Sequence, residues 1–364
     1  MIRILHVVTY MGRGGLETVL MNYYRNIDRS KVQFDFLVHR DFRADYDNEI
    51  ETLGGKIYHL PRLVPWKKSY INALDTFFKN HPEYKIVHIH QDCLSSVALK
   101  VAKNNCIPIR IAHSHANSQD INLKYPIKMY YRRLIPKYAT ELLACSQSAG
   151  DWMFKGAYFK VLNNAIDTTK YSHNQDTASK VRKLLFIPQD SFVVGHIGRF
   201  APVKNHSFLL EIFSKIKQKK PNAILLLVGD GELNNEIRKK VTRMDLNTSV
   251  VFAGVRDDVY NMLQAFDVFV MPSIYEGLGL AIIEAQASGL QCVVSDNVSK
   301  ECNVTDLVSF FSLSKSAEDW ADFIISKAGK ERQSTLDAII KSGYDIRENA
   351  LWLQNHYIEL WESN

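Results

Sequence analysis

Two glutamates in the second half of the chain are spaced so that they could hold one small ligand. Glu276 lies in a glycine-rich stretch that follows Pro272, and Glu284 comes two helical turns later, with seven residues between the glutamates. The stretch before Pro272, AFDVFVM, is apolar and β-branched, and it predicts a buried strand. After Gly279, apolar residues recur at helical spacing. We therefore expect Glu276 in a strand-to-helix loop and Glu284 inside the following helix.

The chemistry that this arrangement favours is the recognition of a sugar nucleotide. The first amides of a helix and its positive dipole end attract a phosphate. Carboxylates repel a phosphate but accept hydrogen bonds from hydroxyl groups. A loop that offers both therefore favours a ligand with both groups. The alternative is a solvated loop glutamate beside an unrelated helix-face glutamate, because the E-x7-E spacing by itself is a weak signal.

Three further loops with glycines or cations also follow apolar strand patterns. The loop MGRGG contributes Gly14 and Gly15, which allow a backbone to approach an anion closely. The loop GRFAPVK supplies Arg199 and Lys204, two cations suited to phosphate oxygens. The loop GDG begins at Gly229. Each could instead be a plain turn or a solvated surface, but together they should converge where parallel strands end, which is where open α/β sheets bind ligands.

Histidines occur twice at alternate positions of a predicted strand, as His88/His90 and His113/His115. Alternate strand residues share one face, so either pair could hold a metal ion. Because no third ligand stands at a suggestive spacing, we predict no metal site. His113 or His115 could instead be a polar catalytic group at a strand end, and a satisfied structural histidine is the alternative.

The segment KYPIKMYYRRLIPK, residues 124–137, interleaves cations with tyrosines and aliphatic residues. A short helix with both kinds of residue suits the surface of an anionic membrane. The alternative is a solvated basic helix face whose apolar side packs into the core. The segment belongs to a basic half of the chain, because residues 1–165 contain 23 Lys and Arg against 14 Asp and Glu. No nucleic-acid motif accompanies this charge, so we expect no nucleic-acid partner.

Length and composition indicate two globular domains. The chain has 364 residues, of which 46% are hydrophobic and 23% charged, enough for two cores. Its five cysteines have no paired spacing, which is typical of reduced thiols in a cytosolic protein. The apolar run at the start is too short for a signal peptide, and no window is long enough for a membrane span.

Strand and helix patterns alternate along the whole chain, which is typical of βαβ units and parallel sheets. The pattern ends within residues 159–172 and then starts again, so we place a hinge there. The expected division is a first domain at 1–166, a second at 167–345 and a C-terminal amphipathic helix within 346–364. A single long doubly wound domain is the alternative, and the length argues against it.

Together, these motifs resemble those of the retaining GT-B glycosyltransferases of family 4, the glycosyl transferases group 1 domain. The resemblance covers nearly the whole chain, and the E-x7-E in PSIYEGLGLAIIEA is its most specific element. It implies an α/β GT-B fold in which two Rossmann-like domains face each other across a cleft. Residues 1–166 would bind the acceptor and residues 167–345 the sugar-nucleotide donor, while the helix within 346–364 would cross back to the first domain.

The same resemblance assigns roles to individual residues. His113 would be the histidine in the cleft, and Arg199 and Lys204 would bind the donor phosphates. Glu276 would lie against the donor sugar, completing the expected catalytic set, and Glu284 would accept hydrogen bonds from the ribose hydroxyls. The other expected substrate contacts are loop glycines and backbone groups, namely Gly14, Gly15, Gly229, Gly254, Val255, Arg256, Gly277, Leu278, Gly279 and Leu280.

The resemblance further implies the reaction. The chain would move a sugar from a nucleotide sugar, for which we expect a UDP-sugar, to a glycan or polyprenyl-linked acceptor in bacterial exopolysaccharide or capsule synthesis. It would need no metal or other cofactor and would act in the cytoplasm, peripherally at the inner membrane face. A sugar-nucleotide 2-epimerase on the same fold and a non-catalytic protein that binds sugar nucleotides or glycans are the alternatives.

Overall fold

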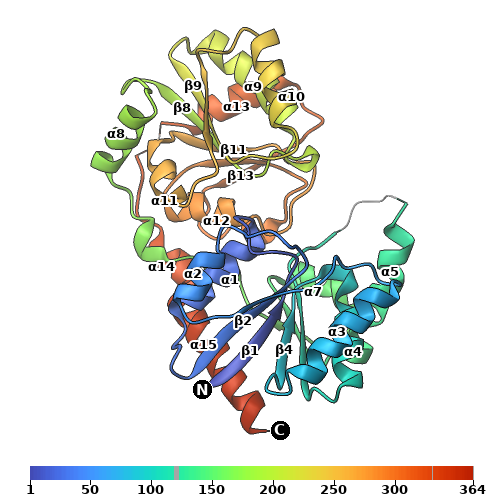
Figure 1. Cartoon of the computed structure of the whole chain (residues 1–364). Helices are drawn as coiled ribbons and strands as arrows, with labels where there is room; N and C mark the ends of the chain where they lie inside the picture. The colour runs from blue at the N-terminus through green and yellow to red at the C-terminus, as the bar shows by residue number, and fades with distance from the viewer. Residues whose placement is uncertain (119–122, 330, 364) are drawn as a thin grey trace. The chain divides into compact units, whose positions relative to one another are not determined.

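The structure is a computed structural model that describes residues 1–118, 123–329 and 331–363, and it divides into two compact units (Figure 1). Unit 1 consists of Met1–Ile166 and Asp345–Asn364, and unit 2 consists of Asp167–Tyr344. Each unit has a parallel β-sheet of its own with helices packed on it. The predicted α/β fold with two Rossmann-like domains is therefore confirmed.

The sheet of unit 1 has seven strands in the order β3-β2-β1-β4-β5-β6-β7. The sequence direction across the sheet reverses between β1 and β4, and such a switch point is where open α/β sheets bind ligands. The strands are β1 (Ile2–Val7), β2 (Val32–Val38), β3 (Ile57–His59), β4 (Ile86–Ile89), β5 (Ile109–Ser114), β6 (Glu141–Ala144) and β7 (Lys160–Val161).

The helices of unit 1 are α1 (Gly15–Asn26), α2 (Asp47–Thr52), α3 (Lys68–Asn80), the short 3-10 helix η1 (Asp92–Leu94), α4 (Ser95–Asn104), α5 (Tyr125–Arg133), α6 (Ile135–Tyr138), α7 (Gln147–Phe154) and α15 (Ile346–Glu362). Helix α15 begins after Asp345, whose side chain accepts a hydrogen bond from the Arg347 amide. The amphipathic pattern near the C-terminus thus forms the predicted helix, and it packs against α1.

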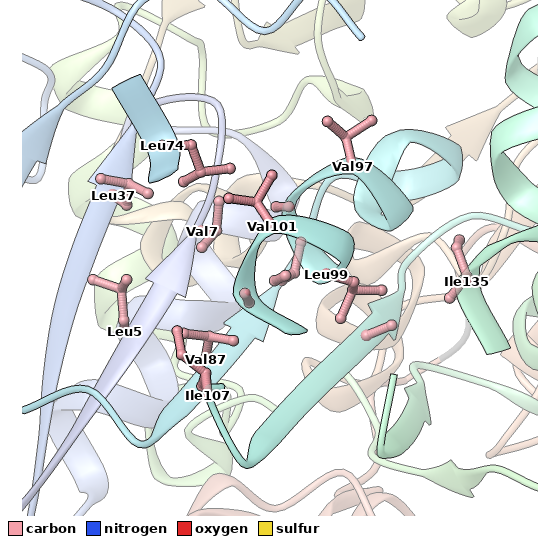
Figure 2. Packing of buried hydrophobic residues seen from close by; sticks show 14 of the residues in the cluster. Leu5, Val7, Leu37, Leu74, Val87, Val97, Leu99, Val101, Ile107 and Ile135 are labelled. Atoms are coloured by element: carbon pink, nitrogen blue, oxygen red, sulfur yellow. The ribbon is translucent and has the colours of Figure 1, made fainter. Parts of the chain in front are cut away.

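The central strands of unit 1 present different residues on their two faces. Leu5 and Val7 of β1 pack with residues of α3 and α4 in the hydrophobic core that Figure 2 shows. The alternate residue, His6, therefore points to the opposite face, where its ring lies beside Phe34. Tyr357 of α15 packs edge-on against Phe34 and so covers this second face.

The sheet of unit 2 has six strands in the order β10-β9-β8-β11-β12-β13, with its switch point between β8 and β11. Its strands are β8 (Phe192–Ile197), β9 (Ala223–Val228), β10 (Val250–Gly254), β11 (Val268–Met271), β12 (Cys292–Ser295) and β13 (Val308–Phe311). Its helices are η2 (Thr168–Lys170), α8 (Gln175–Leu184), η3 (Pro202–Lys204), α9 (His206–Lys219), α10 (Asn234–Arg243), α11 (Val259–Met262), η4 (Leu263–Ala265), α12 (Leu280–Ala287), η5 (Lys300–Cys302), α13 (Ala317–Lys327) and α14 (Leu336–Lys341).

Within the described part of the chain, no helix combines the length and apolar composition that crossing a membrane requires. The cysteines form no disulfide among those same residues. Four of the five are buried, and Cys106 is exposed.

Candidate active site

The loops that follow β8 and β11 lie side by side at the switch point of unit 2. Lys204 ends the short helix after β8, and its ammonium forms an ion pair with the carboxylate of Glu276 in the loop after β11. A backbone hydrogen bond of 2.8 Å from Ile274 to Val203 also joins the two loops. The side chains of Lys204 and Glu276 are 16% and 20% exposed, so both are largely shielded yet reachable by a ligand.

Glu284 lies in the second turn of α12 and is almost fully buried. The hydroxyl of Tyr171 donates a 2.7 Å hydrogen bond to its Oε1. Burial raises the pKa of Glu284 to about 7, and the bond from Tyr171 offsets part of that rise. This carboxyl group therefore sits near its titration midpoint at neutral pH. Tyr171 is a site residue that the sequence reasoning missed, because it lies 113 positions from its partner.

The turn between β11 and α12 requires glycine at one position. Gly279 precedes α12 with a φ of 66°, in the left-handed region, and a Cβ there would lie 3.1 Å from the Cγ of Glu276. Within the described residues, no side chain caps this end of α12. The amides that follow Gly279, beginning with that of Leu280, are therefore not occupied by a side-chain cap. Gly277 lies earlier in the same turn, and Leu278 is buried.

Arg199 does not join the Lys204–Glu276 pair. Its guanidinium forms a 3.0 Å ion pair with Glu232 in the loop after β9, and its side chain is 70% exposed. The two cations expected on one phosphate are therefore directed to different carboxylates. Gly229 has a clear steric role, since a Cβ there would lie 2.1 Å from the carbonyl oxygen of Gly198. Glycine at 229 thus lets the loops after β8 and β9 pack closely.

The loop after β10 is shaped by its own contacts. Gly254 has a φ of 69°, and Val255 is half exposed. The guanidinium of Arg256 makes hydrogen bonds of 2.7 and 2.8 Å to the carboxylate of Asp258. Because that side chain is engaged, the features this loop offers a ligand are its backbone and Val255.

The backbone conformation at the start of α1 does not require glycine. Gly14 precedes the helix with a φ of −92°, which other residues adopt. A Cβ at Gly14 would meet the carboxylate of Glu17, a flexible group, while a Cβ at Gly15 would meet nothing within 4 Å. The backbone geometry therefore does not require glycine at 15, and open space is what a ligand would find there.

The two histidine pairs of unit 1 lie side by side, and a histidine from a third strand lies next to them. His113 is buried, and among the described residues neither of its ring nitrogens has a hydrogen-bond partner. His115 lies nearer the surface, and its Nε2 is 2.9 Å from Nδ1 of His90. Burial lowers the pKa of His113, and it lowers the pKa of His115 to about 4, so both are neutral at neutral pH. His6 of β1 joins this group, a neighbour that spacing along the sequence did not indicate.

The basic segment at 124–137 is not a single cationic face. Arg132 is buried, and its guanidinium lies 4.7 Å from the ring centre of Trp152. Arg132 therefore does not contribute to an exposed cationic side, because it lies against Trp152 of α7. The segment's exposed side nevertheless carries both apolar and cationic residues, namely Lys124, Ile127, Tyr130, Arg133 and Lys137.

Comparisons with known proteins cover both units. Residues 178–343 match the family described as Glycosyl transferases group 1, and residues 13–170 match Glycosyltransferase Family 4. The EpsF protein of Bacillus subtilis (strain 168), which carries the name of a glycosyltransferase, is 35% identical over 98% of this chain and 96% of its own. The UDP-Gal:alpha-D-GlcNAc-diphosphoundecaprenol alpha-1,3-galactosyltransferase of Escherichia coli is 30% identical over 61% of this chain and 60% of its own.

The fold has a match among solved structures. Anabaena Alr3699/HepE, in complex with UDP and glucose, superposes with a TM-score of 0.80 over 99% of this chain and 100% of its own, at 18% identity. That likeness concerns the fold, whereas the sequence matches carry the assignment. The chain belongs to the GT-B glycosyltransferases of family 4, with a glycosyl transferases group 1 domain.

Proposed function

We propose that this glycosyltransferase is a retaining enzyme that moves a sugar from a UDP-sugar to a polyprenyl-diphosphate-linked glycan in the synthesis of a bacterial surface polysaccharide. The observation that carries the proposal is the meeting of Lys204, Glu276 and the start of α12 at the switch point of unit 2. That meeting supports the proposal, because a sugar diphosphate would need a cation, a carboxylate for its hydroxyl groups and helix amides close together.

Each part of the donor has a matching group in unit 2. The ammonium of Lys204 and the first amides of α12 would bind the diphosphate, and Glu276 would accept hydrogen bonds from the sugar. Glu284 would accept hydrogen bonds from the ribose hydroxyls, and the backbone at 254–256 would hold the base. Arg199 would reach the phosphates by exchanging its exposed ion pair with Glu232, and such an exposed pair is worth about 1 kcal/mol or less.

The reaction itself would be a front-face displacement. The bond between the sugar C1 and the β-phosphate oxygen breaks, a bond forms between C1 and the acceptor oxygen on the same face, and the acceptor proton passes to the leaving phosphate. Both glutamates of the site already hold partners, Glu276 with Lys204 and Glu284 with Tyr171. Catalysis would therefore come from stabilising the charge that grows on the diphosphate, with no metal or other cofactor taking part.

The proposed acceptor is supported by the names of the relatives, and its proposed binding site is in unit 1. The Escherichia coli relative is named for a UDP-sugar donor and a diphosphoundecaprenol acceptor. Unit 1 would bind the acceptor, as the resemblance to family 4 implies. The enzyme would work at the cytoplasmic face of the membrane, without a nucleic-acid partner.

Release of UDP tests this proposal against its rivals. The purified protein is incubated with a panel of UDP-sugars, with and without a polyprenyl-diphosphate-linked sugar in detergent. The proposed enzyme releases UDP from one donor only when the acceptor is present, and it does so equally with EDTA. A 2-epimerase converts the donor without acceptor, and a binding protein does neither. The proposal is wrong if no UDP-sugar and acceptor pair gives acceptor-dependent release.

The exposed side of the basic segment should bring the enzyme to anionic membranes. Each cation near such a surface contributes about 1 kcal/mol, and salt weakens the attraction. Liposome binding should therefore increase with the fraction of anionic lipid and decrease with salt. Replacing Lys124, Arg133 and Lys137 together by Ser should remove most of this binding while UDP affinity stays unchanged.

A matched control removes the same charge from unit 2. Lys183, Lys239 and Arg243 are exposed there, and replacing all three by Ser should leave liposome binding near the wild-type level. Arg132 is unsuitable for this test because it is buried against Trp152. Equal loss of binding in both triple variants would mean that net charge, rather than this segment, drives the attraction.

A further inference from the structure

Histidines gather on one face of the central strands of unit 1. His6 of β1 pairs in register with His88 of β4, and His90 follows two positions later at the end of β4. Paired residues and alternate residues of parallel strands share a face, so these three rings lie on the side opposite Leu5 and Val7. That is the face covered by α15, and it lies at the switch point of the sheet.

The three rings are close enough to hold one metal ion. One nitrogen from each of His6, His88 and His90 lies within 4.8 Å of the others. Nδ1 of His6 is 3.1 Å from Nε2 of His90. Tetrahedral zinc with bonds of about 2.0–2.1 Å holds neighbouring ligand nitrogens about 3.3 Å apart. Small side-chain movements would therefore bring all three nitrogens to ligand distance.

The outer nitrogens of two of these rings are already fixed. Nδ1 of His88 is 2.6 Å from the hydroxyl of Tyr357, and Nδ1 of His90 is 2.9 Å from Nε2 of His115. A metal-binding histidine characteristically uses its second nitrogen in such a hydrogen bond, which sets the ring orientation and the tautomer. In both rings this leaves Nε2 directed to the other histidines.

Among the described residues, one inner nitrogen, that of His88, is buried without a partner, and so is the second nitrogen of His6, whose Nδ1 faces His90. In the part of the chain that the structure describes, Nε2 of His6 and Nε2 of His88 have no hydrogen-bond partner. His6 and His88 are 0% and 1% exposed, so bulk solvent does not reach these nitrogens. Buried polar atoms are rarely left unsatisfied, and a ligand would explain why the chain keeps imidazoles here rather than apolar groups.

We propose that His6, His88 and His90 form a binding site for a divalent transition metal ion such as Zn²⁺, which ties β1 to β4 at the switch point of unit 1. Imidazole nitrogens suit Zn²⁺, Co²⁺ and Ni²⁺, whereas Mg²⁺ and Ca²⁺ prefer oxygen ligands. The ion stabilises unit 1 and takes no part in the proposed transfer. A fourth coordination position stays open for water.

A second group, His90, His113 and His115, also meets the distance condition and shares His90 with the first. One ion per chain is therefore expected. The inner group is the better site because it is more deeply buried and because Tyr357 and His115 orient its rings from outside. In the outer group, His115 is partly exposed.

Thermal unfolding of the untagged protein tests the site. Protein stripped with EDTA is titrated with Zn²⁺, Co²⁺, Ni²⁺ and, separately, Ca²⁺. Zn²⁺ should raise the Tm by about 5–10 °C at one hundred times its Kd, while Ca²⁺ should have no effect. Co²⁺ should give the visible absorption bands of a nitrogen-ligated site at one ion per chain. Absence of both the Tm rise and the Co²⁺ bands in the wild type would overturn the proposal.

A pair of matched variants locates the ion. His6→Leu should abolish the Zn²⁺-induced rise in Tm; without metal it removes the unsatisfied Nε2 beside Phe34 together with the contact of Nδ1 with His90, so its own metal-free Tm is the reference for the comparison. His39→Leu is the control, since His39 is buried in the same unit but bonds to Val8 and Tyr70 and belongs to neither group. It should lower the metal-free Tm and keep the Zn²⁺-induced rise.

The outcome with His6→Leu decides between the two groups. If that variant keeps the full Zn²⁺-induced rise, the ion lies at the outer group and the proposed site is wrong. If His6→Leu does not fold, His88→Gln gives the same comparison, because Gln keeps a polar group for the hydroxyl of Tyr357. Loss of the rise in His88→Gln supports the site, and its retention overturns it.

Discussion

Lys204→Met is expected to lower kcat by about 10²–10³-fold while the Kd for UDP changes by only a few fold. The charge on the diphosphate is greatest when the sugar is departing, so a cation placed there stabilises the transition state more than the bound donor. Methionine keeps most of the aliphatic stem of Lys204 and removes the ammonium that pairs with Glu276. Steady-state kinetics with the accepted UDP-sugar, together with calorimetric titration of UDP, give the two quantities.

Two controls separate the charge of Lys204 from its effect on neighbouring groups. Glu276→Gln removes the carboxylate partner but keeps the ammonium, so it should affect the KM for the donor more than Lys204→Met does. Glu232→Gln removes the partner of Arg199 and should leave kcat near the wild-type value, because that ion pair is exposed. Wild-type kcat in Lys204→Met would show that this cation does not stabilise the leaving group.

The local parts of the site could be predicted from the sequence because they depend on neighbouring residues. The apolar run before Pro272 forms β11, and α12 begins at Leu280 after the left-handed Gly279. Glu284 therefore lies inside the helix, as its spacing indicates. Hydrophobic periodicity and a glycine turn determine such features within about ten residues, and no distant contact has to be known.

The pairings between loops could not be predicted in the same way. Lys204 meets Glu276 because the sheet places β8 beside β11, and the order of strands is a property of the whole unit. His6 shows the same limit. It is a single histidine in an apolar strand, so its spacing gives no signal. The register of β1 against β4 brings it beside His88.

In the basic segment, tertiary packing determines which cations are exposed, and the local sequence pattern does not show this. Charge and helical spacing gave no reason to separate Arg132 from Arg133. Trp152, which lies in α7, stacks with Arg132 and buries it, while Arg133 stays exposed.

Glu284→Gln is expected to weaken the binding of uridine by about 10–100-fold, because hydrogen bonds to a charged acceptor contribute about 1.5–3 kcal/mol. Uridine carries the ribose hydroxyls but no phosphate, so its binding reports on this carboxylate without any titration of the ligand near neutral pH. Gln has nearly the same shape as Glu, which limits repacking around Tyr171. Calorimetric titration at about pH 8 measures the difference, and equal affinities would remove Glu284 from the ribose site.

The pH dependence of uridine binding tests the same assignment more sharply. In the free protein the pKa of Glu284 is raised to about 7 by burial. Hydroxyl groups that donate to the carboxylate favour its ionised form, so the bound state has a lower pKa and binds fewer protons. Affinity should therefore rise as the pH increases from about 5.5 to 7 and level off above 7, and it should be flat in Glu284→Gln. Tyr171→Phe removes the hydrogen bond that lowers this pKa, so the rise should move to higher pH. An unshifted pH profile in Tyr171→Phe would mean that Tyr171 does not influence the ionisation of Glu284.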